Sequence, residues 1–268
     1  MTRPSRQCGF TLVELIIVIV ITGILAASLT IFLKPAIDAW QDSRRRAELT
    51  DMADHALRRM AQDIRRAVPN SVIEHSPNCL QLVPTLSGGG YRRQTDASGN
   101  GAVLDTSTST SQFDVLTPMY PLAAAGDWVV VNNQNTGDVY NGSNRQAIAS
   151  IATPAPGGTG EHRITLQSAR QFPLGYDGGR FVIVANGEQS VFYTCHGNRL
   201  YRIVDSFASG KDTCASSGSV LASDISACTF AYESGVTQQS GMVWMQLSLT
   251  RDGESIHLAH GSHVDNIP

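Results

Sequence analysis

The feature of this sequence that most constrains its fold is an apolar run of 24 residues, Phe10 to Leu33, close to the N-terminus. The polar residues within this run are Thr11, Glu14, Thr22, Ser28 and Thr30. An α-helix rises by about 1.5 Å per residue, so a helix over the whole run would be roughly 36 Å long and could cross a bilayer. The sequence therefore predicts a membrane-spanning helix at residues 10–33.

The residues ahead of the apolar run indicate how that helix would be oriented. Residues 1–9 contain Arg3 and Arg6 and no acidic residue, so the positive-inside rule places the N-terminus in the cytoplasm and the rest of the chain outside. A cleaved secretory signal is an alternative, because the stretch from Ile24 to Ser28 resembles a signal peptidase site. Glu14 favours a retained helix, since a carboxylate at membrane depth is costly and persists mainly where it has a partner or a function.

The sequence around this carboxylate, Cys8-Gly9-Phe10-Thr11-Leu12-Val13-Glu14-Leu15, resembles the prepilin signature of type IV pilins and type II secretion pseudopilins. The resemblance implies that a prepilin peptidase cleaves between Gly9 and Phe10 and that Phe10 is then N-methylated. It also implies that Glu14 pairs with the Phe10 amine of a neighbouring subunit during assembly. Two charges in lipid are tolerable mainly as a pair, so such pairing would set the subunit register. The alternative is a signal anchor whose Glu14 merely lies near the membrane interface.

The helical pattern continues beyond the apolar run, through residues 34–69. Charged pairs Asp42/Arg46 and Asp54/Arg58 stand at i,i+4 spacing on one face. Apolar residues recur on the opposite face, mostly at steps of three and four: Ile37, Trp40, Leu49, Met52, Ala53, Ala56, Leu57, Met60, Ala61, Ile64 and Val68. This pattern predicts an amphipathic helix that ends at Pro69-Asn70.

Residues 70–268 have a different character, with short β-branched or aromatic runs separated by turn residues. Two sequences, Asn186-Gly187 and Asp252-Gly253, are typical of hairpin turns. The predicted strands lie at 79–83, 113–116, 128–131, 163–166, 181–185, 190–194, 200–204, 228–232, 243–249 and 255–260. Stretches rich in Gly, Ser and Thr at 85–112, 153–160 and 206–219 are expected to be exposed loops. The sequence therefore predicts an α+β fold, a long N-terminal helix packed on an antiparallel β-sheet domain, as the resemblance to type IV pilins also implies.

Four cysteines would remain after removal of a leader that contains Cys8, and an even number suits an oxidising compartment. Cys79, Cys195, Cys214 and Cys228 allow three pairings, and their spacing does not select one. A weak preference goes to Cys195 with Cys214, closing a short loop, and Cys79 with Cys228. We expect at least one structural disulfide.

The sequence contains little that indicates catalysis or a cofactor. Gly88-Gly89-Gly90 lacks the following Lys-Ser/Thr of a phosphate-binding loop, and no G-x-S-x-G motif is present. His257, His260 and His263 form a metal-like cluster, but on a strand His260 would face away from the other two. The pI of about 6.1 does not favour a nucleic-acid partner. We therefore expect a protein that is not an enzyme and has no metal, cofactor or nucleic acid.

Several segments further along the chain resemble a minor pilin of the mannose-sensitive haemagglutinin (MSHA) type IV pilus. These segments are residues 44–51, 56–60, 68–72, 82–86, 180–184 and 193–195. The resemblance implies a subunit that is assembled into the filament, or primes it, for surface attachment. Its partners would be the prepilin peptidase, major and minor pilins, an inner-membrane assembly platform and membrane lipid.

Two other functions remain open from the sequence. One is a minor pseudopilin of a type II secretion system, although no acidic loop of the EF-hand type is visible. The other is a membrane-anchored binding domain that never polymerises, which Glu14 disfavours. In the preferred interpretation the chain is a single-pass protein of the bacterial inner membrane, with its β domain in the periplasm before it reaches the pilus.

Overall fold

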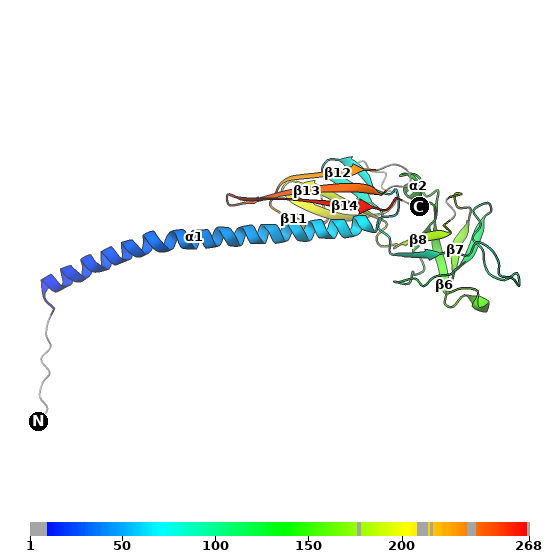
Figure 1. Ribbon diagram of the computed structural model, residues 1–268, viewed down its shortest axis with the longest axis horizontal. Helices are drawn as coiled ribbons and strands as arrows, with labels where there is room; N and C mark the ends of the chain where they lie inside the picture. The colour runs from blue at the N-terminus through cyan, green and yellow to red at the C-terminus, as the bar shows by residue number, and fades with distance from the viewer. Residues whose placement is uncertain (1–9, 176–177, 208–213, 215–216, 235–239, 267–268) are drawn as a thin grey trace, which may run out of the picture. The chain divides into compact units, whose positions relative to one another are not determined.

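The computed structural model describes residues 10–175, 178–207, 214, 217–234 and 240–266 (Figure 1). The chain begins with one long helix, α1 (Leu12–Arg65), and continues into strands whose pairings are all antiparallel within these residues. It divides into two compact units, one ending at Glu48 and the other beginning at Leu49. The predicted α+β fold, a long apolar N-terminal helix followed by an antiparallel β domain, is therefore confirmed.

The last part of α1 belongs to the second unit and is amphipathic. Its buried apolar residues recur at three- and four-residue steps, which places them on one face of the helix. They are Leu49, Ala53, Ala56, Leu57, Met60, Ala61 and Ile64. This face forms one hydrophobic core with side chains from two β-sheets. Burial of that face, more than helix propensity, holds this part of α1 in place.

Helix α1 ends at Arg65, four residues before the predicted end at Pro69. The reason is that the next residues pair with an extended segment. Ala67 forms a β-bridge with Pro84, and the Val68 N–H donates a 2.8 Å hydrogen bond to the Val83 carbonyl oxygen. Tertiary backbone pairing thus replaces the last turn that the periodicity predicts.

Two sheets share the core with α1. The five-stranded sheet has the order β1-β2-β9-β10-β11, and the three-stranded sheet has the order β12-β13-β14. The strands of the first are β1 (Ile73–Ser76), β2 (Cys79–Leu82), β9 (Ser190–His196), β10 (Arg199–Asp205) and β11 (Ser219–Ser223). Those of the second are β12 (Ile225–Glu233), β13 (Gly241–Arg251) and β14 (Glu254–Val264).

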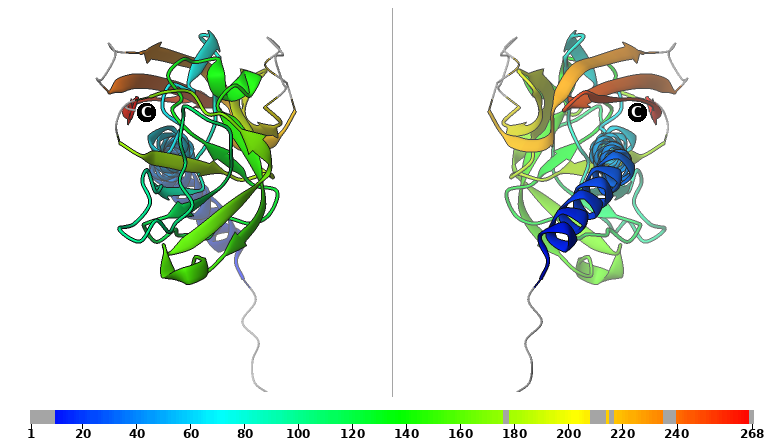
Figure 2. Two further views of the ribbon diagram at one scale, coloured as in Figure 1. Left: turned by 90° about the vertical axis from the view of Figure 1, so that its right-hand side faces the viewer. Right: turned by 90° about the vertical axis from the view of Figure 1, so that its left-hand side faces the viewer.

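The remaining strands form a six-stranded sheet with its own core, in the order β3-β8-β5-β6-β7-β4. They are β3 (Ser87–Gly90), β8 (Arg180–Val184), β5 (Trp128–Val130), β6 (Arg145–Ala152), β7 (His162–Arg170) and β4 (Thr110–Val115). A bridge between Tyr91 and Val115 joins the two edges. The Arg92 N–H donates to the Asp114 carbonyl and the Leu116 N–H to the Gly90 carbonyl, each at 2.8 Å. The sheet is therefore closed into a small barrel, whose mostly green strands curve around one another in Figure 2.

The two predicted hairpin turns have different outcomes. Asp252-Gly253 joins β13 to β14, with φ of 49° and 86°, the left-handed values that a two-residue hairpin turn of this type requires. Asn186-Gly187 does not form a hairpin. It connects β8 of the barrel to β9 of the five-stranded sheet, because each strand finds its partners elsewhere in the chain.

All ten predicted runs overlap strands, whereas β1, β3, β6 and β11 were not expected. Strand β3 lies inside the predicted loop at 85–112, where its glycines gave no strand signal. The 153–160 stretch contains a short 3-10 turn, η1 (Pro156–Gly158), and a four-residue helix, α2 (Asp138–Asn141), precedes β6. Most of the predicted loop at 206–219 lies outside the described residues. The domain limits expected after residues 9, 33 and 69 stay predictions.

Candidate membrane-insertion and assembly segment

The first turn of α1 is organised by Thr11. The Glu14 N–H donates a 3.2 Å hydrogen bond to Thr11 Oγ1, and the Leu15 N–H donates at 3.2 Å to the Thr11 carbonyl. Thr11 is therefore the N-cap, and Glu14 occupies the third helical position, where capping boxes place a Glu or Gln. This capping role of Thr11 and Glu14 was not predicted from the sequence. The Thr-x-x-Glu spacing ahead of an apolar run is the signal that would have predicted the cap.

Glu14 is the only ionisable residue between Phe10 and Leu33. It lies in the first turn, where the positive end of the helix dipole favours a carboxylate. Among the described residues, no hydrogen bond or ion pair reaches its carboxylate. Phe10, the predicted mature N-terminus, is 81% exposed, and Gly9 and Cys8 lie outside the described residues.

The other polar side chains of the apolar run bond within the helix. The hydroxyls of Thr22, Ser28 and Thr30 donate to carbonyl oxygens four residues earlier, at 2.6, 2.8 and 2.9 Å. A hydroxyl satisfied in this way adds little cost in an apolar environment. The segment therefore presents lipid-compatible surface apart from the Glu14 carboxylate.

The apolar side chains of this segment are exposed and are not covered by other described residues of the chain. The large ones from Phe10 to Leu33 are about half exposed or more, and none of its most hydrophobic window is buried. By length and composition the helix can cross a membrane. Ile37 and Trp40, expected on the buried face, are 51% and 61% exposed, so burial begins at Leu49. The expectation of a buried face from Ile37 onward is therefore wrong, and only the part of α1 from Leu49 is covered by the β domain.

In the second unit, a buried carboxylate joins α1 to the five-stranded sheet. Asp63 is fully buried and accepts hydrogen bonds from the Tyr193 hydroxyl at 2.6 Å, Arg202 Nε at 2.9 Å and Arg66 Nη2 at 2.7 Å. Burial by itself would raise the pKa of Asp63, but the hydrogen bonds from Tyr193 and Arg202 outweigh it and lower the pKa. Burial and this neighbouring carboxylate raise the pKa of Tyr193, which therefore stays a hydrogen-bond donor.

The cysteines form two disulfides, Cys79 with Cys214 and Cys195 with Cys228. The pairing preferred from the sequence is therefore wrong. Cys79 lies opposite Thr194 in the β2–β9 ladder, beside Cys195, and Cys228 on β12 reaches Cys195 across the junction of two sheets. The Cys195–Cys228 bond consequently ties the five-stranded sheet to the three-stranded one. Such bonds typically contribute about 2–4 kcal/mol.

Within the described part of the chain, the remaining sequence candidates do not come together in one site. His257, His260 and His263 lie on β14, where burial alternates and His260 faces inward. No group of three potential metal ligands occurs among the described residues. Gly88 to Gly90 form strand β3 and not a loop before a helix. The expected lack of a cofactor and of enzymatic activity stays a prediction.

Comparison with protein-family models matches residues 4–30 to the prokaryotic N-terminal methylation motif. The match includes Gly9, Phe10 and Glu14, the residues that the sequence analysis assigned to processing and assembly. Comparison with curated proteins and with solved structures finds no match. The motif, the exposed apolar helix that carries it and the antiparallel β domain that follows together support placing this chain in the type IV pilin-like superfamily.

Proposed function

We propose that this chain is a minor pilin of a type IV pilus of the MSHA kind, most like the subunit MshO. It would be assembled into the filament, or prime it, for surface attachment. Its role would be structural and not enzymatic. The observation that carries this proposal is the exposed apolar segment at residues 10–33, in which Glu14 is the single ionisable side chain and has no partner within the described residues.

In this proposal the subunit first occupies the bacterial inner membrane, with residues 1–9 in the cytoplasm and the β domain in the periplasm. The prepilin peptidase cleaves between Gly9 and Phe10 and methylates the new N-terminus. An assembly platform then moves the helix from lipid into the filament, where exposed apolar residues pack against other pilins. Glu14 pairs with the amine of a neighbour's Phe10, because the attraction between the two charges offsets part of the cost of placing each of them in an apolar environment.

The minor role is supported by the size of the β domain. The core shared with α1 uses only two of the three sheets. The barrel has a separate core of aromatic and aliphatic side chains, including Phe113, Phe172 and Phe181, and so adds surface beyond what helix packing requires. Such added surface suits a subunit of the priming or tip complex. The scattered segments between residues 44 and 72, at 82–86, at 180–184 and at 193–195 that resemble the MSHA minor pilin also support the assignment.

The experiment that tests the proposal is N-terminal peptide and intact mass spectrometry in the native host, with and without its prepilin peptidase. A mature chain that begins at N-methylated Phe10 only when the peptidase is present would support it. An intact leader, or a cut near Ala27, would contradict it. Two assays on a strain that lacks this protein then distinguish a pilus subunit from a pseudopilin. One is an immunoblot of sheared filaments, and the other is an assay of type II secretion.

A further inference from the structure

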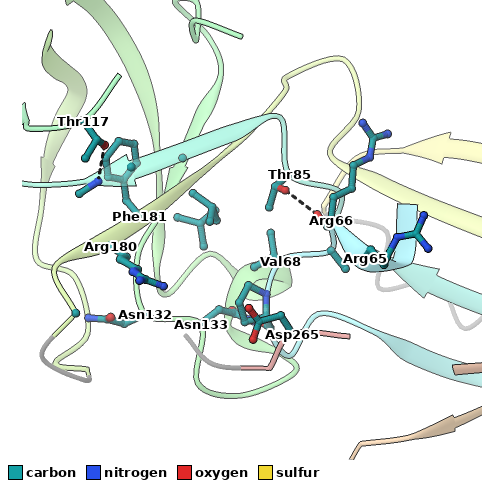
Figure 3. Close-up of a pocket in the computed structure, with 18 residues that line it drawn as sticks. Arg65, Arg66, Val68, Thr85, Thr117, Asn132, Asn133, Arg180, Phe181 and Asp265 are labelled. Carbon is teal, nitrogen blue, oxygen red and sulfur yellow. Dashed lines mark hydrogen bonds between the residues drawn. The ribbon is translucent and has the colours of Figure 1, made fainter. Parts of the chain in front are cut away.

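The second unit contains a pocket of about 510 Å³ that the assembly role does not use (Figure 3). Its volume lies in the range of small-molecule sites. Strands β3, β8 and β5 of the barrel form its floor, and the residues that follow α1 form a wall. The opening is therefore in the β domain and does not involve the apolar segment.

The strand register explains why a pocket forms there. Gly88 pairs with Val182, and Val182 pairs with Val130, so these three residues share one face across the floor. A Cβ added to Gly88 would lie 2.6 Å from the Phe181 carbonyl oxygen, and one added to Gly89 would lie 2.5 Å from Thr117 Oγ1, so both positions are too close to their neighbours for a side chain. At Gly90, in contrast, a Cβ would have no neighbour closer than 3.8 Å, so this glycine leaves space where another residue would place a side chain.

The next pair of residues on this face includes a charged side chain, that of Arg180. Gly90 pairs with Arg180, and Asn132, which follows β5, lines the same pocket as Arg180. Figure 3 shows the Arg180 guanidinium extending toward Asn132 and Asn133 inside the pocket. Arg180 forms no hydrogen bond or ion pair with any described residue. Arg66 differs, since it is paired with Asp63 and Glu188.

Polar groups that line the pocket retain hydrogen-bonding capacity. Asn132 Nδ2 donates to the Pro173 carbonyl at 2.9 Å, which leaves its Oδ1 as an acceptor. The Thr117 hydroxyl accepts from the Gly90 N–H at 3.0 Å and can still donate, and the Thr85 hydroxyl donates to the Arg66 carbonyl at 2.7 Å and can still accept. Arg65, Arg66 and Asp265 also line the pocket, so its charged residues are net positive. The pocket thus offers the Arg180 guanidinium, groups that can bond to hydroxyls and an apolar floor.

We propose that this pocket binds a small polyhydroxylated carboxylate of the size of one sugar ring, a sugar acid, with Arg180 bound to its carboxylate. The guanidinium fork matches a carboxylate with two parallel N–H donors. The sugar hydroxyls would bond to Asn132 and Thr117, and the apolar face of the ring would lie over Val182. This inference does not depend on filament assembly.

The test is binding of glucuronate to the full-length chain in detergent, measured by calorimetry at constant ionic strength, with glucose as the neutral probe. Glucuronate should bind and glucose should bind at least about tenfold more weakly, because it lacks the charge-assisted bonds. Arg180→Gln should weaken glucuronate binding by about tenfold or more. Arg199→Gln is the matched control, since Arg199 begins strand β10 as Arg180 begins β8, is also exposed, and lies outside the pocket.

A second variant tests the shape of the pocket independently of its charge. A Cβ at Gly90 would have no neighbour closer than 3.8 Å, so Gly90→Val should fold, as far-UV circular dichroism would verify, and should obstruct the site. Equal binding of glucose and glucuronate, equal losses in Arg180→Gln and Arg199→Gln, or undiminished binding in a folded Gly90→Val variant would each overturn the proposal. Absence of glucuronate binding to the wild type would overturn it as well.

Discussion

Asp63 and Tyr193 are separated by 130 positions, yet the Tyr193 hydroxyl donates a 2.6 Å hydrogen bond to the Asp63 carboxylate inside a core that excludes water. Arg202 donates to the same oxygen at 2.9 Å. A carboxylate can be buried on an apolar helix face only when such donors replace its hydration. This contact therefore connects the end of α1 to strands β9 and β10 of the five-stranded sheet.

Removal of this carboxylate should destabilise the protein strongly. Asp63→Ala leaves Arg202 and Tyr193 without their acceptor and should cost about 3–5 kcal/mol, the usual result of breaking a buried charge pair. The measurement is denaturant unfolding of the full-length chain in detergent. Asp54→Ala is the control, because Asp54 pairs with Arg58 on the exposed helix face and its loss should change the midpoint little. Equal effects of the two substitutions would contradict the structural role.

The same carboxylate should make stability depend on acid pH. The pKa of Asp63 is lower in the folded protein, where hydrogen bonds from Tyr193 and Arg202 exceed the opposing effect of burial. The stabilisation is therefore fully present above the unfolded pKa, about 3.9, and is lost as the pH falls below it through the folded pKa. Unfolding midpoints measured between about pH 2 and pH 7 should fall more steeply for the wild type than for Asp63→Asn. Parallel curves would refute this linkage.

Two substitutions of Glu14 should distinguish its role in helix capping from its role in charge pairing. Glu14→Ala should leave the protein processed but poorly incorporated into filaments. Glu14→Gln keeps a residue that suits the third position of a capping box, but it removes the charge, so it should also assemble poorly. Immunoblots of sheared filaments, with N-terminal mass spectrometry to verify processing, provide the measurement. Normal incorporation of the Gln variant would show that the pairing argument is wrong.

Disulfide mapping should find Cys79 linked to Cys214 and Cys195 linked to Cys228 in non-reduced peptide digests. The Cys195→Ser/Cys228→Ser double variant should lose about 2–4 kcal/mol of stability relative to the wild type. The double variant also avoids a free thiol, which could exchange with the remaining bond. A Cys195–Cys214 peptide in the unreduced wild type would contradict the observed connectivity.

The features predicted from the sequence depend on residues close together in the chain. The apolar helix follows from the uninterrupted composition of residues 10–33, and the β13–β14 hairpin follows from Asp252-Gly253, whose positive φ values suit a two-residue turn. The residues predicted to serve in processing and assembly, Gly9, Phe10 and Glu14, lie within one short motif that the family comparison also matches. Periodicity, turn geometry and motifs are local properties, so reading them requires no knowledge of distant partners.

The features that the sequence did not predict depend on partners far along the chain. Asn186-Gly187 has the composition of a hairpin turn, yet β8 and β9 separate because each pairs more extensively with strands of a different sheet. Strand β3 is almost all glycine and is defined only by its ladder with β8, which also opens the Arg180 pocket. Tertiary packing likewise decided the cysteine pairing and the donors around Asp63, because long-range pairing is set by the competition among all strands for partners and not by local propensity.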